Sequence, residues 1–239
     1  KQETPKNSDF FTDNLKGKVY QTVSTDYKVD STGKIGEQDS CCVATSKYDE
    51  KGYITEYGSA DKAGANVNNE TFTHYDNGAM KDITNTKNGI QNSSISIQVN
   101  KDGKYTTAQE FDSTKKLKNY YTDIAQNDYG QITSMKKYNA DSTLSSTMTN
   151  NYDKSTFTSG ENKDSTGKVT RSSVAKYDDK NNIMESDTKN TVKDSTTSKV
   201  TKYKYDSFDD KGNWTERTET DENGKPLKII KREITYYKD

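Results

Sequence analysis

His74 is the only histidine of the chain, so a Ser-His-Asp or Cys-His arrangement would have to include it. It directly precedes Tyr75 and a tight turn, and we interpret it as a strand-end residue. Zinc binding needs several His or Cys at fixed spacing. The sequence lacks that spacing, and it also lacks the glycine-rich phosphate loops G-x-G-x-x-G and G-x-x-x-x-G-K-[ST]. We therefore predict no catalytic residue, no metal site and no cofactor.

Carboxylates are plentiful, with 37 Asp and Glu in the chain, and a pair of them can hydrolyse a glycosidic bond. With so many acids, some pair lies at any chosen distance by chance. Most of these acids occupy turns, where they bond to the backbone. The tandem acids Asp178-Asp179 and Asp209-Asp210 lack the ligand spacing of a calcium loop. A hydrolase acting on surface polysaccharide is therefore the alternative to a protein without enzymatic activity.

Aromatic residues are a better indication of function, because the chain has 17 Tyr although only 27% of its residues are hydrophobic. Such rings can replace missing aliphatic core as cross-strand pairs. They can also form a flat platform for a glycan or a protein. Adjacent pairs send one ring to each face of a strand, so some rings must lie on the wetter face. The candidate binding residues are Trp214, Tyr203, Tyr205, Tyr236, Tyr237, Tyr120 and Tyr121.

Turn-forming residues divide the chain at regular intervals. A Tyr-Asp or Phe-Asp pair followed by Gly or Asn recurs about every 25 to 31 residues, and a second family of Asp- and Gly-rich turns falls between these copies. The segments between turns alternate as strands do, with Ile95, Ile97 and Val99 on one side. Each repeat unit is therefore predicted to be a β-hairpin. The first family lies at 48–52, 75–78, 100–103, 127–130, 152–153, 177–181 and 208–212, and the second includes 30–34, 61–64, 112–115, 141–143, 164–168 and 221–225.

The Tyr-Asp punctuation resembles the YD (RHS-like) repeat of secreted proteins and lipoproteins of Gram-negative anaerobes. Middle copies depart from the pattern, since Asn100 and Asn127 replace the Tyr and Asn181 replaces the Gly. The resemblance implies a structural or binding β-array that is exported and carries a lipid or surface anchor. It is carried by Lys16-Gly17-Lys18-Val19, by Phe208-Asp209-Asp210-Lys211-Gly212-Asn213-Trp214-Thr215-Glu216-Arg217, and by Ile234-Thr235-Tyr236-Tyr237.

The triplet Asp-Ser-Thr resembles the O-glycosylation acceptor pattern of some Gram-negative anaerobes. Plain turn chemistry, in which Asp and Ser bond to their own backbone, is the preferred explanation. The acceptor residues would be Ser31, Ser113, Ser142, Ser165 and Ser195.

Charge and composition limit the partners. Lys and Arg number 36 against 37 Asp and Glu, a net charge of -1. The chain therefore lacks the excess of basic residues that is typical of a nucleic-acid-binding protein. No apolar stretch is long enough for a membrane-spanning helix. We expect a non-enzymatic binding or scaffold module, secreted or at the cell envelope (periplasm or outer-membrane surface) and held there by an N-terminal lipid anchor. Its partner would be an envelope protein or a glycan.

The fold is predicted in two parts. Residues 1–16 are expected to form a polar tether, in which either Asp9 caps a short helix that ends before Gly17 or the chain runs in as a short extended segment. Residues 17–239 form an all-β antiparallel meander of about eight hairpin repeats. Because the sparse apolar residues cannot fill a large core, we expect a long, twisted, largely single-layer sheet. The alternative is a compact β-sandwich or a closed barrel.

Overall fold

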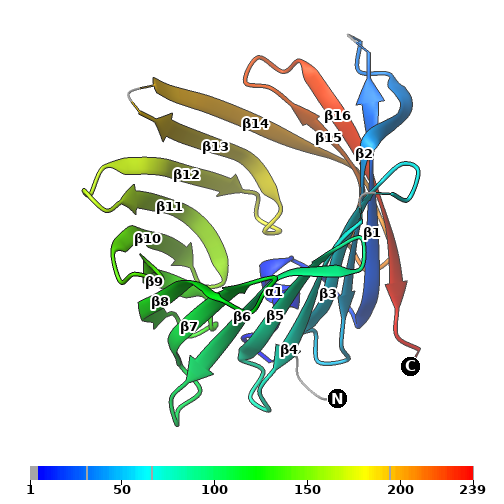
Figure 1. The fold of residues 1–239 in the computed structure, drawn as a ribbon. Coiled ribbons are helices and arrows are strands. Elements are labelled where there is room, and N and C mark those ends of the chain that lie inside the picture. The colour runs from blue at the N-terminus through cyan, green and yellow to red at the C-terminus, as the bar shows by residue number, and fades with distance from the viewer. Residues whose placement is uncertain (1–4, 31, 66, 194, 239) are drawn as a thin grey trace.

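The computed structural model describes residues 5–238 apart from 31, 66 and 194, and position 42 by its backbone alone. The described residues form sixteen antiparallel strands in chain order and one helical turn (Figure 1). The elements are α1 (Asp9–Thr12), β1 (Val19–Val29), β2 (Ile35–Tyr48), β3 (Ile54–Asp61), β4 (Asn68–His74), β5 (Met80–Lys87), β6 (Ile90–Val99), β7 (Tyr105–Asp112), β8 (Leu117–Gln126), β9 (Ile132–Asn139), β10 (Leu144–Asp153), β11 (Thr156–Asp164), β12 (Val169–Tyr177), β13 (Ile183–Val192), β14 (Ser195–Phe208), β15 (Trp214–Thr220) and β16 (Pro226–Tyr236).

The sheet closes into a barrel, because the first strand pairs with the last. The β1–β16 register runs from Val19 opposite Tyr236 to Tyr27 opposite Ile229. The prediction of an open sheet is therefore wrong, and the closed barrel given as the alternative is confirmed. An open sheet would leave two edge strands with unpaired backbone N–H and C=O groups. The accumulated twist of so long a sheet brings its two edges together, so closure pairs these groups. The all-β antiparallel prediction is confirmed.

The two families of turns lie at opposite rims, as alternating strand directions require. Even-numbered strands run toward one rim, here called the Tyr-Asp rim, and odd-numbered strands run toward the other, the far rim. At the Tyr-Asp rim, an Asp or Asn side chain organises most of the turns. The Oδ1 atom of Asp209 accepts the backbone N–H groups of Lys211 at 3.0 Å and of Asn213 at 2.8 Å, and Gly212 supplies the positive φ of 83°.

The middle repeats are in a different register from the one predicted. Asn100 and Asn127 stand where other copies have Asp, not Tyr, since their Oδ1 atoms accept the same two backbone N–H groups. Asn has the same acceptor oxygen as Asp, so the turn is preserved. Tyr75 is also displaced by one position, because its backbone makes the bond to Ala79 that Asp49 makes to Tyr53.

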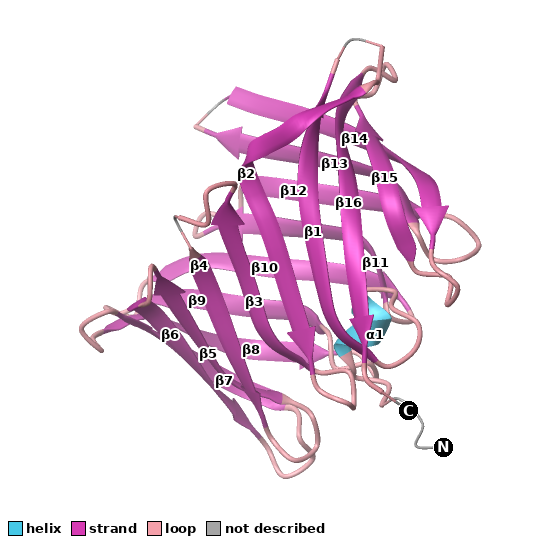
Figure 2. Cartoon of the chain, turned by 90° about the vertical axis from the view of Figure 1, so that its right-hand side faces the viewer, coloured by secondary structure: helices cyan, strands magenta, loops and turns pink. Residues whose placement is uncertain are grey.

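The small core lies at the Tyr-Asp rim, where α1 packs inside the barrel end (Figures 1 and 2). Phe10 and Leu15 are buried against Val19 and Tyr48. Ser8, not the predicted Asp9, caps the helix: its side chain accepts the N–H of Phe10, and its hydroxyl donates to the carbonyl of Gly52 at 2.9 Å. From Asn7 onward the predicted tether is therefore a docked segment, and residues 7–16 are here called the plug.

Candidate functional site

Strand register identifies the inner face of the wall, because directly paired residues share a face. Met135 is opposite Met148, and Asn150 is opposite Gly160. Three of these residues, Met135, Met148 and Asn150, line a pocket together with residues of α1. Because α1 packs inside the barrel, this face of the strands points into the lumen. The intervening residues point outward, and among them Asn151 is opposite Ser159.

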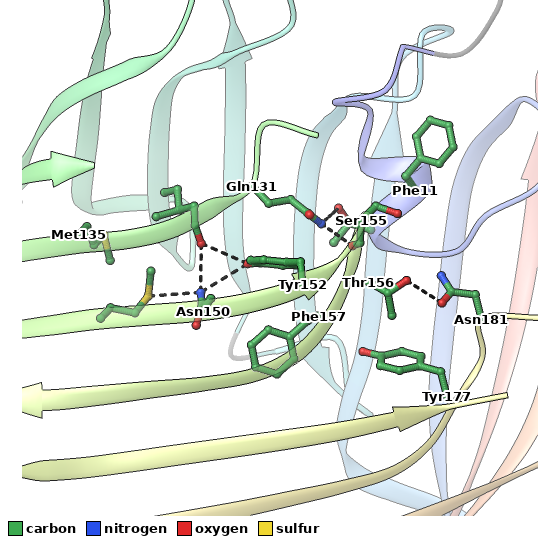
Figure 3. A pocket seen from close by; sticks show the side chains of 13 residues that line it. Phe11, Gln131, Met135, Asn150, Tyr152, Ser155, Thr156, Phe157, Tyr177 and Asn181 are labelled. Carbon is green, nitrogen blue, oxygen red and sulfur yellow. Dashed lines mark hydrogen bonds between the residues drawn. The ribbon is translucent and has the colours of Figure 1, made fainter. Parts of the chain in front are cut away.

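The pocket has a volume of about 450 Å³ and lies between the plug and the inner face of strands β9–β12 (Figure 3). Such a volume falls in the range of small-ligand pockets. One wall belongs to the plug, and the remaining walls belong to strands and to turns of the Tyr-Asp rim. The lining residues are Phe11, Thr12, Gln131, Ile132, Met135, Met148, Asn150, Tyr152, Ser155, Thr156, Phe157, Tyr177 and Asn181.

Apolar side chains cover one side of this pocket. The paired thioethers of Met135 and Met148 are adaptable packing surfaces. The rings of Tyr152 and Phe157 meet edge to face, 5.9 Å apart. Gly160 leaves room for this group, because a Cβ atom there would lie 2.4 Å from Asn150 Oδ1 and 3.1 Å from Phe157 Cε2. Any larger residue at position 160 would therefore collide with side chains of the pocket wall.

Neutral polar groups complete the lining. Gln131 donates from Nε2 to the carbonyl of Ser155 at 2.6 Å, and Thr156 donates to Asn181 Oδ1 at 2.7 Å. The Asn150 amide is bonded less well. Its Nδ2 atom lies 3.3 Å from the Ile132 carbonyl and 3.4 Å from the Tyr152 hydroxyl, beyond the usual 2.9–3.0 Å.

The described lining of the pocket is uncharged. None of the described lining residues is Asp, Glu, His, Lys or Arg. General acid–base catalysis normally uses one of these groups with its pKa near the operating pH. What the lining offers is apolar contact, amides and hydroxyls.

The buried carboxylates lie in the plug instead. Burial raises the pKa of Asp9 to about 6 and also raises the pKa of Asp13. Asp9 accepts the N–H of Ile54 at 2.7 Å, and Asp13 accepts the hydroxyl of Tyr48 at 2.5 Å. A buried acid with a perturbed pKa that lies in a pocket is typical of an enzyme. Here both exist, but neither Asp9 nor Asp13 is among the lining residues, and both bond to the barrel wall.

One repeated position of the Tyr-Asp rim, the residue whose N–H closes each Asp or Asn turn, contributes to holding the plug. Four of these turn-closing residues contact the plug through their side chains. Asn213 does so most fully: its Oδ1 accepts the N–H of Lys16 at 2.8 Å, and its Nδ2 donates to the Lys16 carbonyl at 2.8 Å. The other three contacts are Tyr53 with Asn7, Gln131 with Thr12 and Asn182 with Asn14.

Four of the predicted binding aromatics gather on the inner face of β14–β16, away from the pocket. The Arg217 guanidinium lies 4.9 Å from the ring of Tyr203 and 4.6 Å from that of Trp214. Arg232 stacks on Trp214 at 3.8 Å, and burial and the charge of Arg217 lower its pKa to about 10. Tyr205 lies beside Trp214, with ring centroids 6.1 Å apart. The fourth ring, Tyr236, donates to Asp209 and accepts from Asn213.

The remaining three predicted aromatics lie elsewhere, and the adjacent pairs split between faces. Tyr121 points inward and donates to Glu110 at 2.9 Å. Tyr120 points outward and stacks on Tyr138, with centroids 5.1 Å apart. Tyr237 donates to the carbonyl of Tyr48 at 2.6 Å, near the barrel seam. The seven residues therefore do not form one platform.

Three of the Asp-Ser-Thr triplets, at 112–114, 141–143 and 164–166, lie in turns at the far rim. The Thr hydroxyl of the triplet donates to its Asp, at 2.7 Å for Thr114 and 2.6 Å for Thr143 and Thr166. The intervening serines are exposed. Ser113, Ser142 and Ser165 occupy these turns and Ser195 begins β14, whereas Ser31 lies outside the described residues.

His74 ends β4 and stacks on Tyr53, with centroids 5.3 Å apart. Burial lowers its pKa. Among the described residues, no group of three or more His, Cys, Asp or Glu is placed to hold a metal ion.

Sequence reasoning missed the pocket residues. Asn150, Met135 and Met148 carry no motif, and their convergence depends on strand register. One signal was present: Gly160 interrupts a strand rather than a turn, and such a glycine often marks close approach of another group.

The outer face carries ion pairs across neighbouring strands. Lys47 lies 3.0 Å from Glu56, and Lys176 lies 2.8 Å from Glu185. Exposed pairs of this kind contribute little to stability. Their presence shows instead that these parts of the wall suit contact with water, since lipid-facing barrels present an apolar band outward.

No family model matches the chain, and no curated protein matches it. Among solved structures, it is similar to a porin-like protein from Bacteroides uniformis ATCC 8492, with 16% identity over 91% of this chain and 96% of that chain and a TM-score of 0.56. A porin-like protein from Bacteroides vulgatus ATCC 8482 matches with 13% identity, coverage of 92% and 99%, and a TM-score of 0.46. The Photorhabdus luminescens Tc holotoxin pore matches with 13% identity, coverage of 87% and 11%, and a TM-score of 0.37. The first of these similarities shows a shared barrel fold.

The described part of the chain contains no helix long and apolar enough to cross a membrane.

Proposed function

We propose that this chain is a non-enzymatic binding module of the cell envelope, and that its ligand is a glycan bound in the lumenal pocket. The observation that carries the proposal is the uncharged lining of that pocket, where aromatic rings and thioethers lie beside amides and hydroxyls. Sugars present both apolar C–H faces and hydroxyls, so they suit such a surface. A sixteen-stranded barrel is too wide for its lumen to be filled by side chains, which leaves space for an extended ligand.

The location follows from independent features. The YD-like repeats imply export, and the charged outer wall favours an aqueous compartment at the envelope, the periplasm or the outer-membrane surface. A lipid anchor preceding the plug would leave the far rim open to a ligand, because the plug occupies the opposite end.

A hydrolase acting on surface polysaccharide is the competing function. The separation of the buried carboxylates from the pocket lining argues against it, since a glycosidase needs two carboxyl groups flanking the scissile bond. Asp9 and Asp13 bond to Ile54 and Tyr48 instead.

The test is co-sedimentation of the purified full chain with polysaccharide fractions of a Gram-negative envelope, with reducing ends measured in parallel. We expect binding without release of reducing ends. Gly160→Ala should abolish binding, because the added Cβ pushes Asn150 and Phe157 into the pocket.

Gly58→Ala is the matched control. Gly58 is also a strand glycine beside an Asn side chain, with Asn69 Oδ1 3.1 Å from an added Cβ, but it lies on the outer face. Equal binding by both variants, or no binding by the unaltered chain, would refute the proposal. Release of reducing ends would establish the hydrolase.

A further inference from the structure

Charge restricts the ligand of the lumenal pocket. A carboxylate or phosphate that leaves water needs a cationic or strongly donating partner, or it pays a large desolvation penalty. The described lining has no Lys or Arg. Lys137, two residues beyond Met135 on β9, also faces the lumen, but it lies 3.9 Å from Glu110 and over the ring of Tyr121. The inward guanidinium groups of Arg217 and Arg232 belong to another part of the wall, on β15 and β16. The pocket therefore favours an uncharged ligand.

The amide of Asn150 points to a carbonyl acceptor on that ligand. Its Nδ2 atom has three acceptors, the Ile132 carbonyl at 3.3 Å, the Tyr152 hydroxyl at 3.4 Å and the Met148 sulfur at 3.6 Å. Both distances to oxygen are long, and sulfur is a weak acceptor. A carbonyl oxygen at normal distance would be a better partner, and the side chain can offer it without breaking a strong bond.

Apolar groups adjoin this donor. Met148 lies within contact of the Asn150 amide, and Tyr152 and Phe157 lie on the same side of the pocket (Figure 3). A substituent that reaches Asn150 through a carbonyl would therefore place its remaining carbon atoms against thioether and aromatic surface. A methyl group fits such a surface, since Met side chains adapt to small apolar groups.

We infer that the pocket recognises a neutral glycan through an acetamido substituent, whose carbonyl accepts from Asn150 and whose methyl group packs against Met148 and Phe157. This inference rests on the proposed function and names the ligand class of the same pocket. Gly160 belongs to this arrangement, because it allows Asn150 and Phe157 to approach the strand.

The test is calorimetric titration of the full chain with two disaccharides of the same linkage. One is the β-linked dimer of N-acetylglucosamine, and the other is cellobiose, which lacks the acetamido groups. We expect the acetylated sugar to bind about tenfold more tightly, the scale of one hydrogen bond with its apolar contact.

Asn150→Ala should reduce this preference to less than about threefold. Asn151→Ala is the control, because Asn151 is the next residue of β10, points outward and bonds to Ser159. Equal affinity for the two sugars, no binding of the acetylated sugar, or a preference retained in Asn150→Ala would overturn the inference. If the envelope polysaccharide still binds in a manner sensitive to Gly160→Ala, the proposed function survives that failure.

Discussion

Asn213 should be one of the most important polar residues for stability. It is 2% exposed, and its side chain makes three short hydrogen bonds: two to the backbone of Lys16 and one to the Tyr236 hydroxyl at 2.7 Å. Asn213→Ala removes all three and leaves the Lys16 N–H and carbonyl without their partner. At about 0.5–1.5 kcal/mol per bond, the expected loss is about 2–4 kcal/mol in the free energy of unfolding.

The assay is thermal and urea unfolding followed by circular dichroism. For a chain of this size, the expected loss corresponds to a fall in Tm of roughly 4 to 16 °C. Asn223→Ala is the control, because Asn223 is an exposed residue in a far-rim turn and contributes its backbone N–H to Asp221. Limited proteolysis should also cut the plug faster in Asn213→Ala than in the control. If the two variants unfold within about 0.5 kcal/mol of each other, the turn-closing residues do not hold the plug.

Three further predictions concern the same end of the barrel. Ser8→Ala should lower the free energy of unfolding by about 1 kcal/mol, because it removes the helix cap and the hydrogen bond to Gly52. Unchanged urea unfolding would contradict a docked plug. The pKa of Asp9 is raised on folding from 3.8 to about 6, so the native state binds the extra proton and stability is lost as pH rises from about 4 through 6. Asn at this position does not titrate, so the Tm of the unaltered chain should fall relative to that of Asp9→Asn over this interval, and a relative rise would contradict the raised pKa. His74→Ala should leave glycan binding intact in the sedimentation assay, because His74 stacks on Tyr53 outside the pocket. Loss of binding with the fold preserved would show that His74 belongs to the binding site.

The hairpin repeat could be predicted from the sequence because its causes are local. A turn needs an oxygen on Asp or Asn that reaches N–H groups two and four residues later, as Asp209 does, and a residue that tolerates positive φ, such as Gly212. Both requirements act within five residues, so they are visible as a pattern. The equivalence of Asn100 with Asp could not be seen in the Tyr-Asp motif, because the repeats share a side-chain acceptor oxygen rather than a residue type.

Register within the wall was predictable only in part. Alternation showed that Tyr120 and Tyr121 face opposite sides, and they do. It could not show which side is the lumen, because both faces of these strands are polar over much of their length. Packing determines which face is the lumenal one. The plug covers one face of the sheet near the Tyr-Asp rim, and that face becomes the inner face all around the barrel.

Closure, the plug and the pocket depended on tertiary structure. The pairing of Val19 with Tyr236 joins residues at opposite ends of the chain, and no local propensity encodes such a contact. The sequence by itself determined the strands, the turns and their two families. Tertiary structure decided that the sheet closes, that residues 7–16 dock inside it, and that Asn150 meets Met148 and Phe157 beneath the plug. The physical reason is that turns depend on short-range hydrogen bonds, whereas closure and pocket formation depend on the summed twist of sixteen strands and on contacts between residues far apart in the chain.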